Sequence, residues 1–200
     1  MKHLIVVAHP LVDSFTMNLM RAYASELEKL GHTQVTADLY RQGFDPVLPA
    51  HELGPISLDN PSCTEVAQAQ SEIRAADVLT LIYPLWWLSM PAILKGYIDR
   101  VFSRGFAYES QQGVVHGLLG GKRSVLITLS GAPLQLLESK GSWNAILTLQ
   151  DTHVLRSAGF DLLEHLHFDQ IAPGLSQATA DAAMTRVGRC AREHFSEKLL

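Results

Sequence analysis

Two adjacent tryptophans, Trp86 and Trp87, lie in a stretch whose residue types suit the binding of a flat ring. The apolar run Val78–Tyr83 before them predicts a buried strand, which Pro84 ends, and Pro91 then opens an amphipathic helix. Large flat side chains in a loop beyond a buried strand are where an α/β protein holds a flat aromatic ligand. The alternative is that both are ordinary core tryptophans. Their position in a turn, rather than inside a helix or strand, argues against this for the two together.

A second candidate segment follows the β-branched, apolar stretch Leu4–Ala8. Asp13 or Ser14 can cap the next helix, whose free N–H groups and positive dipole end make an anion site. His9 can add a donor to a phosphate, and Ser14 and Thr16 can add hydroxyls. Alone, the segment favours a simple cap at Ser14 and a surface turn histidine at His9. After a buried first strand it favours phosphate.

A third segment, Leu129–Ser130–Gly131–Ala132, follows the strand predicted at Ser124–Leu129. Gly131 and Ala132 allow close backbone approach, and Ser130 supplies a hydroxyl. We expect this segment to form the third wall of the same pocket. Turns of small residues are common after strands, so this segment alone does not identify a site.

Five alternations of strand and helix position these segments. The predicted strands are Leu4–Ala8, Thr33–Leu39, Val78–Tyr83, Ser124–Leu129 and Phe160–Leu166, and the further helices are Ser14–Leu30, Thr64–Ala76, Trp143–Ala158 and Ser176–Leu200. This pattern predicts an α/β fold, a doubly wound five-stranded parallel sheet of flavodoxin-like order 2-1-3-4-5 with helices on both faces. We expect one domain over residues 1–200, with ligand beyond the carboxyl ends of strands 1, 3 and 4.

Composition narrows the class of protein. With 200 residues, 47% hydrophobic and 18% charged, the chain is globular, and its net charge of −4 without a basic stripe excludes a nucleic-acid binder. The uncharged run of 17 residues at Val78–Leu94 is too short for a membrane span and contains two prolines. The amino-terminal stretch has no signal-peptide cleavage pattern, so we expect a cytoplasmic protein with Cys63 and Cys190 as buried or idle thiols.

Three further patterns are weaker evidence of a functional site. The glycine-rich Gly117–Arg123 lacks the spacing of a nucleotide-triphosphate loop and is interpreted as a turn. His165 and His167 share a strand face, but without a third ligand we expect solvated histidines and no metal site. The loop Tyr40–Asn60 is long for a compact domain, and such loops are often functional.

Taken together, these segments resemble the NAD(P)H:quinone reductases of the DT-diaphorase type, which have bacterial relatives among drug-activity modulators and ancillary subunits of potassium-efflux systems. The resemblance rests on LIVVAHPLVDSFT, DLYRQGFDPVLP, YPLWWLSMPAILKGYIDRVFSRGFAY and the spacing near Ser157–Phe160. It implies a flavodoxin-like fold, a tightly held flavin, and a homodimer with active sites at the subunit interface.

The resemblance also implies roles for individual residues. The segment that holds the flavin phosphates and ribityl chain corresponds to His9, Ser14, Phe15 and Thr16, where the family usually has asparagine at Thr16. The loop against the isoalloxazine ring corresponds to Pro84, Leu85, Trp86, Trp87 and Leu88, and the loop at its far edge to Leu129, Ser130, Gly131 and Ala132. The aromatic positions on the substrate side correspond to Phe106 and Tyr108. The family's tyrosine and histidine after the fourth strand are missing, and Lys140 near that place is interpreted as a surface lysine, so no catalytic residue is assigned.

The implied activity is a ping-pong transfer of two electrons from NAD(P)H through the flavin to a quinone or similar acceptor. FAD is expected over FMN, because the Tyr40–Asn60 loop is long enough to cover an adenine. The alternatives are reduction of azo or nitro compounds, a regulatory subunit of a membrane potassium-efflux transporter, and a flavin-binding electron carrier, against which the modest net charge argues. The natural acceptor and the choice between NADH and NADPH stay open.

Overall fold

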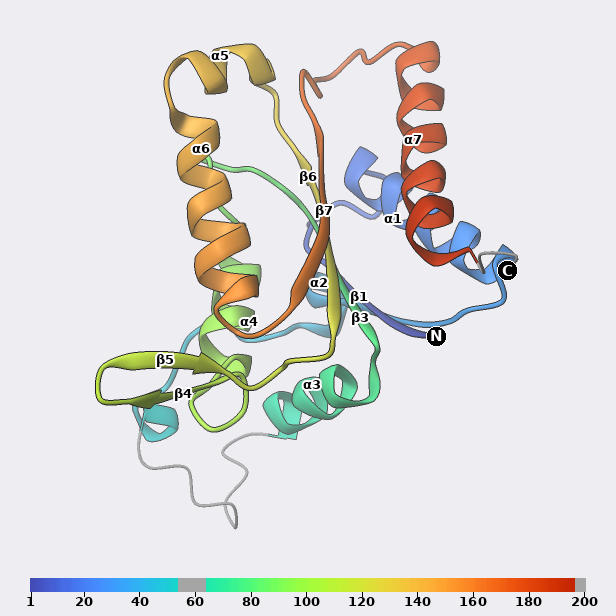
Figure 1. Cartoon of the computed structure of the whole chain (residues 1–200). Coiled ribbons are helices and arrows are strands. Elements are labelled where there is room, and N and C mark those ends of the chain that lie inside the picture. Colours follow the sequence, from blue (N-terminus) through green and yellow to red (C-terminus); the bar gives the residue numbers. More distant parts are fainter. Residues whose placement is uncertain (54–63, 197–200) are drawn as a thin grey trace.

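A computed structural model describes residues 1–53 and 64–196. Its main sheet has five parallel strands in the order β2-β1-β3-β6-β7, which confirms the predicted topology (Figure 1). The strands are β1 (Lys2–Val7), β2 (Thr33–Asp38), β3 (Val78–Pro84), β6 (Arg123–Leu129) and β7 (Asp161–Phe168). Strands β1, β3 and β6 are buried along nearly their whole length because helices cover both faces of the sheet.

Two hydrophobic clusters lie on the two faces of the sheet. On one face, α1 (Phe15–Lys29) and α7 (Gln177–Phe195) pack against the sheet. On the other face lie α3 (Thr64–Ala75), α4 (Ala92–Val101) and α6 (Ser142–Ile146) (Figure 1). Along β3, side chains alternate between the two clusters, as the two-residue period of a strand requires.

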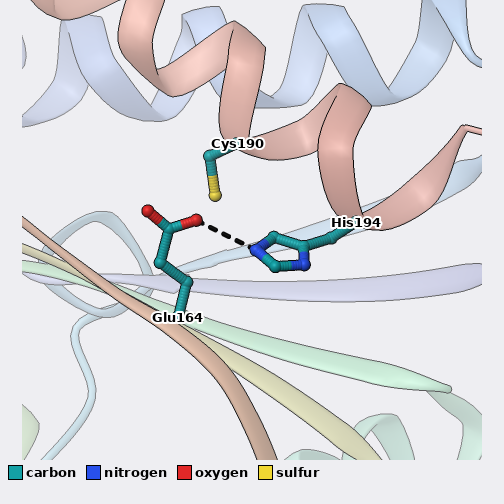
Figure 2. A group of neighbouring side chains, drawn as sticks. All are labelled: Glu164, Cys190 and His194. Carbon is teal, nitrogen blue, oxygen red and sulfur yellow. Dashed lines mark hydrogen bonds and ion pairs between the residues drawn. The ribbon is translucent and has the colours of Figure 1, made fainter.

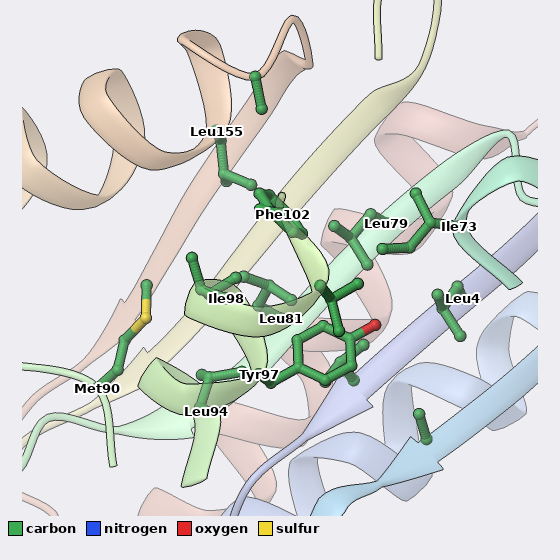
Figure 3. Packing of buried hydrophobic residues seen from close by; sticks show 14 of the residues in the cluster. Leu4, Ile73, Leu79, Leu81, Met90, Leu94, Tyr97, Ile98, Phe102 and Leu155 are labelled. Carbon is green, nitrogen blue, oxygen red and sulfur yellow. The ribbon is translucent and has the colours of Figure 1, made fainter. Parts of the chain in front are cut away.

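The helix α4 supplies much of the second cluster (Figure 3). Leu94 and Tyr97 are almost fully buried on its inner face, next to Leu81 of β3. Burial of each such side chain stabilises the fold by roughly 1.5–3 kcal/mol. This packing fixes the orientation of α4, and therefore of the turn that precedes it.

The segment after β2 is fastened to α4 by a buried ion pair. Arg100 donates to both carboxylate oxygens of Glu52, at 3.0 and 2.8 Å, and also to the Asp45 carbonyl. Gly96 lets this segment approach closely, since a Cβ there would lie 2.3 Å from the carbonyl oxygen of Pro46. Glu52 belongs to the short 3-10 helix η1 (Ala50–Leu53), which follows α2 (Leu39–Gln42).

Several elements differ from the sequence-based expectation. The antiparallel hairpin of β4 (Tyr108–Gln111) and β5 (Val114–Gly117) and the short helix α5 (Leu134–Ser139) were not predicted. The helix predicted at Trp143–Ala158 is α6 continued by a π-helix, η2 (Leu147–Arg156). The helix predicted at Ser176–Leu200 has Ser176 as its N-cap and ends at Phe195, and residues 197–200 lie outside the described ranges. None of the helices in residues 1–53 and 64–196 combines the length and apolarity of a bilayer crossing.

Candidate functional site

Three loops meet beyond the carboxyl ends of β1, β3 and β6. Leu85, directly after β3, donates its N–H to the Leu129 carbonyl at the end of β6, at 2.7 Å. The His9 ring after β1 lies 5.9 Å from the Trp86 ring, centroid to centroid. The structure therefore brings together the three segments that the sequence singled out, at the edge where open α/β sheets bind ligands.

The amino terminus of α1 forms the first wall. Ser14 is the N-cap, and its Oγ accepts a hydrogen bond from the Met17 N–H at 3.3 Å. The N–H groups of Phe15 and Thr16 precede the first intrahelical donor and have no carbonyl acceptor within the helix. Thr16 is buried, while Ser14 and Phe15 are half-buried. Ser14 does act as a cap, and its hydroxyl hydrogen is still available to an anion.

His9 and Arg41 order the loop before α1. Nδ1 of His9 accepts the Leu11 N–H at 3.1 Å, which leaves Nε2 as the donor of the neutral ring. Burial lowers the pKa of His9, and Arg41 lowers it further. Arg41 donates to the carbonyls of His9 and Pro10. Sequence reasoning missed Arg41, which pairs with Asp38 at 2.8 Å and holds the backbone of this loop in place.

The turn after β3 presents both tryptophans to solvent. Trp86 and Ser89 exchange two backbone hydrogen bonds, at 3.1 and 3.0 Å, and enclose Trp87 and Leu88. Both enclosed residues have positive φ, 51° and 61°, as a type I′ turn requires. Such turns favour Asn-Gly, so bulky residues there store strain of about 1–2 kcal/mol each. Trp86 is 42% and Trp87 101% exposed, which excludes the alternative of core tryptophans.

The loop after β6 forms the third wall. Leu129 and Ser130 are buried, Ala132 is half-buried and Gly131 is exposed. Ser130 donates its hydroxyl hydrogen to the Ala132 carbonyl at 2.7 Å, which closes the loop. A Cβ on Gly131 would meet only the Ile171 carbonyl oxygen, at 3.6 Å, within 4 Å. The fold therefore does not need glycine there, and there is open space around this position.

A buried chain of polar side chains runs inward from Ser130. Nε2 of His167 lies 3.1 Å from the Ser130 Oγ, and Nδ1 of His167 lies 2.8 Å from the Thr128 Oγ1. That same oxygen lies 2.8 Å from Nε2 of His165, whose Nδ1 lies 2.8 Å from Asp151 on η2. The expectation of solvated histidines was wrong, because the two rings pack beneath Trp143 with Thr128 between them. Sequence spacing could not identify this chain, since its members come from three elements.

The protons available to these side chains determine which atom donates in each of the hydrogen bonds between Ser130 and Asp151. Burial lowers the pKa of His167 to about 4, so this ring is neutral near neutral pH. Since the Ser130 hydrogen points to Ala132, Nε2 of His167 must be the donor to Ser130, and the Thr128 hydroxyl must donate to Nδ1. Thr128 then accepts from Nε2–H of His165, and Nδ1 of His165 and the Asp151 carboxylate share the last hydrogen bond of the chain.

The β4–β5 hairpin lies at the other end of the sheet (Figure 1); Tyr108 is the first residue of β4, and Phe106 comes just before it. Phe106 is buried beneath Arg74, whose guanidinium carbon lies 4.7 Å from the ring centroid. Tyr108 is half-buried and lines a cavity of about 580 Å³. Other residues around this cavity include Ile98, Phe102, Val115 and His153. Within one chain, neither aromatic residue is brought to the three loops.

The structure also tests the expectations for Lys140 and for the long loop after β2. Lys140 is exposed at the C-cap of α5, which agrees with a surface lysine. The described part of the long loop, up to Leu53, runs along α4 and ends near Tyr108 and Glu109 of the hairpin, around a second cavity. This part of the loop gives no support to an adenine cover, and its remainder lies outside the described residues.

The model of a protein family described as having a flavodoxin-like fold matches residues 1–189. The chain belongs to this flavodoxin-like family. An uncharacterized NAD(P)H oxidoreductase of Haemophilus influenzae is 43% identical over 129 residues, which cover 62% of this chain and 61% of that protein. The matched region thus spans less than two thirds of the length of this curated relative.

Two solved structures are similar over nearly the whole chain. A putative quinone reductase from Klebsiella pneumoniae has a TM-score of 0.88 at 25% identity, covering 100% of this chain and 87% of that one. The NAD(P)H:quinone oxidoreductase from Methanothermobacter marburgensis has a TM-score of 0.82 at 25% identity, covering 99% and 98%. Both share the parallel sheet and therefore the edge at which the three loops meet.

Proposed function

We propose that this protein is a flavin-dependent NAD(P)H:quinone oxidoreductase that transfers two electrons in a ping-pong cycle. The observation that carries the proposal is the meeting of the three loops, fixed by the Leu85–Leu129 hydrogen bond and the contact of His9 with Trp86. The similarity to a putative quinone reductase and to an NAD(P)H:quinone oxidoreductase supports the same activity.

The residues of the three walls fit a flavin. The N–H groups of Phe15 and Thr16, Nε2–H of His9 and the Ser14 hydroxyl are donors for its phosphates, with Arg41 nearby. Trp86 offers an exposed aromatic face to the ring. The open space above Gly131 leaves room for the ring edge. The resemblance favours FAD over FMN.

When bound, the flavin supplies the hydride chemistry, and the protein orients and tunes it. The Pro84–Leu88 turn and the Leu129–Ala132 loop hold the ring between them in this proposal. The backbone of the second loop, together with Ser130, faces the polar edge of the ring. To pass a proton to that edge, the Ser130 hydroxyl must first turn away from the Ala132 carbonyl, and His167 would then replace the proton through Thr128 and His165.

The active unit we propose is a homodimer. Tyr108 is separated from the three loops of its own chain, so it can contact the substrate only in the site of a second copy. The exposed apolar residues Val114, Val115 and Leu118 on and beside the hairpin are candidates for the contact surface. Light scattering should then give a dimer, and Val115→Glu should shift the population toward monomer.

The decisive experiment is an absorbance spectrum of the purified protein, followed by NADPH without oxygen. We expect flavin bands that bleach, and rapid recovery on addition of a quinone; heat-released cofactor then identifies FAD or FMN. The acceptor panel should also contain azo and nitro compounds. A protein that binds neither flavin, even in excess, would contradict the proposal. A flavin that NADPH and NADH cannot reduce would favour the carrier or regulatory alternatives.

Matched variants locate the cofactor. Trp86→Ala should weaken flavin retention, because it removes the aromatic face. Leu149→Ala, which also truncates an exposed apolar residue but lies on η2, should leave retention unchanged. Equal loss in both variants would show that the cofactor binds elsewhere.

A further inference from the structure

A thiol, an imidazole and a carboxylate converge between α7 and the sheet, away from the three loops (Figure 2). Cys190 and His194 lie four residues apart on α7, on the same face of the helix, and Glu164 projects from β7 toward them. One ligand atom from each residue lies within 4.8 Å of the other two. We propose that Glu164, Cys190 and His194 bind a divalent zinc-type metal ion.

The geometry needs only small adjustments. Zinc holds nitrogen, oxygen and sulfur ligands at about 2.0–2.3 Å in a tetrahedron, which places neighbouring ligand atoms roughly 3.3–3.8 Å apart. Nε2 of His194 and Oε2 of Glu164 are 2.9 Å apart, so this pair must open slightly while the thiol approaches. Side-chain rotations supply both movements without displacing the backbone: Glu164 turns away from His194, and χ1 of Cys190 brings the thiol closer.

The donor set selects the type of ion. Thiolate and imidazole favour zinc and similar transition metals, whereas calcium and magnesium require mostly oxygen ligands. Without metal, burial and the neighbouring Glu164 raise the pKa of the Cys190 thiol, so it keeps its proton. Binding transfers that proton to solvent, and the thiolate and the carboxylate then balance the two positive charges of the ion.

Access and surroundings also suit a bound ion. The Cys190 side chain is buried, but the side chains of His194 and Glu164 are 26% and 32% exposed. A water molecule can therefore fill the fourth position from the solvent side. The nearby Arg186 is engaged elsewhere, because it donates to the His167 carbonyl at 2.9 Å and stacks on Phe168.

The site differs from every other titratable cluster in residues 1–53 and 64–196. No other three ligand atoms from His, Cys, Asp and Glu come this close in the described part of the chain. The ion would add a third ligand, the Cys190 thiolate, to the His194–Glu164 contact that already links the last helix to the last strand. Because the unfolded chain lacks the assembled site, binding should raise the free energy of unfolding.

The test uses Co²⁺ as a spectroscopic probe for zinc. Cys63→Ser serves as the background, so that Cys190 is the only thiol, and the purified protein keeps its own cofactor. Difference spectra with and without Co²⁺ report thiolate coordination in the near-ultraviolet and four-coordinate geometry in the visible range. We expect one equivalent of Co²⁺ with both signals, displaced by Zn²⁺.

Matched variants in the same background separate the site from adventitious binding. Cys190→Ser should abolish the thiolate band, and His194→Gln or Glu164→Gln should weaken binding at least about tenfold, as even second-shell changes do at metal sites. Glu193→Gln removes an exposed charge from the same helix, where Glu193 pairs with Arg189 at 3.9 Å, and should change binding far less than Glu164→Gln does. Circular dichroism without metal verifies that each variant folds.

Three results would overturn the proposal. The first is a thiolate band that persists in Cys190→Ser, and the second is its complete absence in the folded Cys63→Ser protein. The third is equal weakening by Glu193→Gln and Glu164→Gln, which would indicate an adventitious ion at the surface only. The outcome is independent of flavin reduction, because the site lies on the opposite face of the sheet from the chain that ends at Asp151.

Discussion

The Oγ atom of Ser130 lies 3.1 Å from Nε2 of His167, so the loop after β6 is hydrogen-bonded to a buried histidine of β7. The loop after β6 therefore contacts buried polar side chains as well as solvent. Since His167 is neutral and its other nitrogen is bonded to Thr128, a change of charge above the loop can reverse the direction of these hydrogen bonds. This relationship motivates the first prediction.

Thr128→Val should interrupt the chain without changing the loop. It leaves His167 and His165 without their shared partner, which should lower the free energy of unfolding by about 1–3 kcal/mol. It should also slow reduction of the bound cofactor and change the pH dependence of that rate. Thr80→Val is the matched control, since Thr80 is equally buried and donates instead to the Tyr23 hydroxyl at 3.2 Å. Identical pH profiles for the two variants would exclude a role in proton transfer.

Relief of strain in the turn after β3 should raise the free energy of unfolding and lower the affinity for flavin. In the double variant Trp87→Asn, Leu88→Gly, residues that tolerate positive φ replace bulky ones, so unfolding should require about 1–2 kcal/mol more. Flavin affinity should fall, because the exposed ring at Trp87 is lost. Denaturant unfolding and cofactor titration measure the two effects separately.

The hairpin turn provides the control for that double variant. Gln112 and Gly113 have φ of 52° and 81°, so Gln112→Asn makes the favoured Asn-Gly pair far from the three loops. It should stabilise the fold and leave flavin affinity unchanged. A loss of affinity in Gln112→Asn, or none in the double variant, would contradict the assigned role of the turn.

Alanine at Gly131 should affect flavin binding, whereas alanine at Gly96 should affect the stability of the fold. Gly131→Ala should leave unfolding unchanged, because its Cβ finds only an ordinary contact, but it should weaken flavin binding by filling the open space. Gly96→Ala should destabilise the fold by about 1–3 kcal/mol, because its Cβ would overlap the backbone of Pro46. Thermal unfolding of the cofactor-free proteins and flavin titration distinguish the two. Full affinity in Gly131→Ala would place the ring elsewhere.

Acidic pH should destabilise the protein through two buried histidines. Burial lowers the pKa of His3 and of His167 to about 4, below the usual 6.5 of the unfolded chain. As pH falls from 6.5 toward 4, the unfolded chain binds protons that the folded protein excludes. The free energy of unfolding should therefore fall, by up to about 1.4 kcal/mol per pH unit for each histidine.

The variant His3→Leu isolates one of the two contributions. Both His3 ring nitrogens are buried without a hydrogen-bond partner within the described structure, so leucine removes no hydrogen bond. Denaturant unfolding at about pH 7 and about pH 5, at equal cofactor loading, should show a smaller decrease in His3→Leu than in the parent. An unchanged decrease would mean that His3 is not the proton-binding group.

The sheet and its ligand-binding edge could be predicted because strands covered on both faces carry continuous apolar runs. Val78–Pro84 is buried along nearly all its length, and its alternating side chains serve both clusters. Because helices connect the strands, neighbouring strands must run parallel to each other. This parallel orientation brings the three loops to one edge of the sheet. For these reasons the His9, Trp86 and Ser130 segments were recognised before their contacts were known.

The features that were missed depend on distant partners or lack an apolar pattern. Both strands of the β4–β5 hairpin are largely exposed, so no alternation marked them. Thr128 and His165 are 37 residues apart, and Asp151 reaches His165 from a π-helix that sequence patterns do not distinguish from an α-helix. Arg41 acts on His9 from 32 residues away.

The separation of Tyr108 from Trp86 has a genetic consequence. If each catalytic centre of the dimer takes its ring-binding turn from one copy and its hairpin tyrosine from the other, neither copy owns a complete centre. A gene copy defective at Trp86 and another defective at Tyr108 would each produce an inactive protein. Expressed together, they would form mixed pairs in which one centre is doubly damaged and the other intact, so two recessive defects would rescue each other.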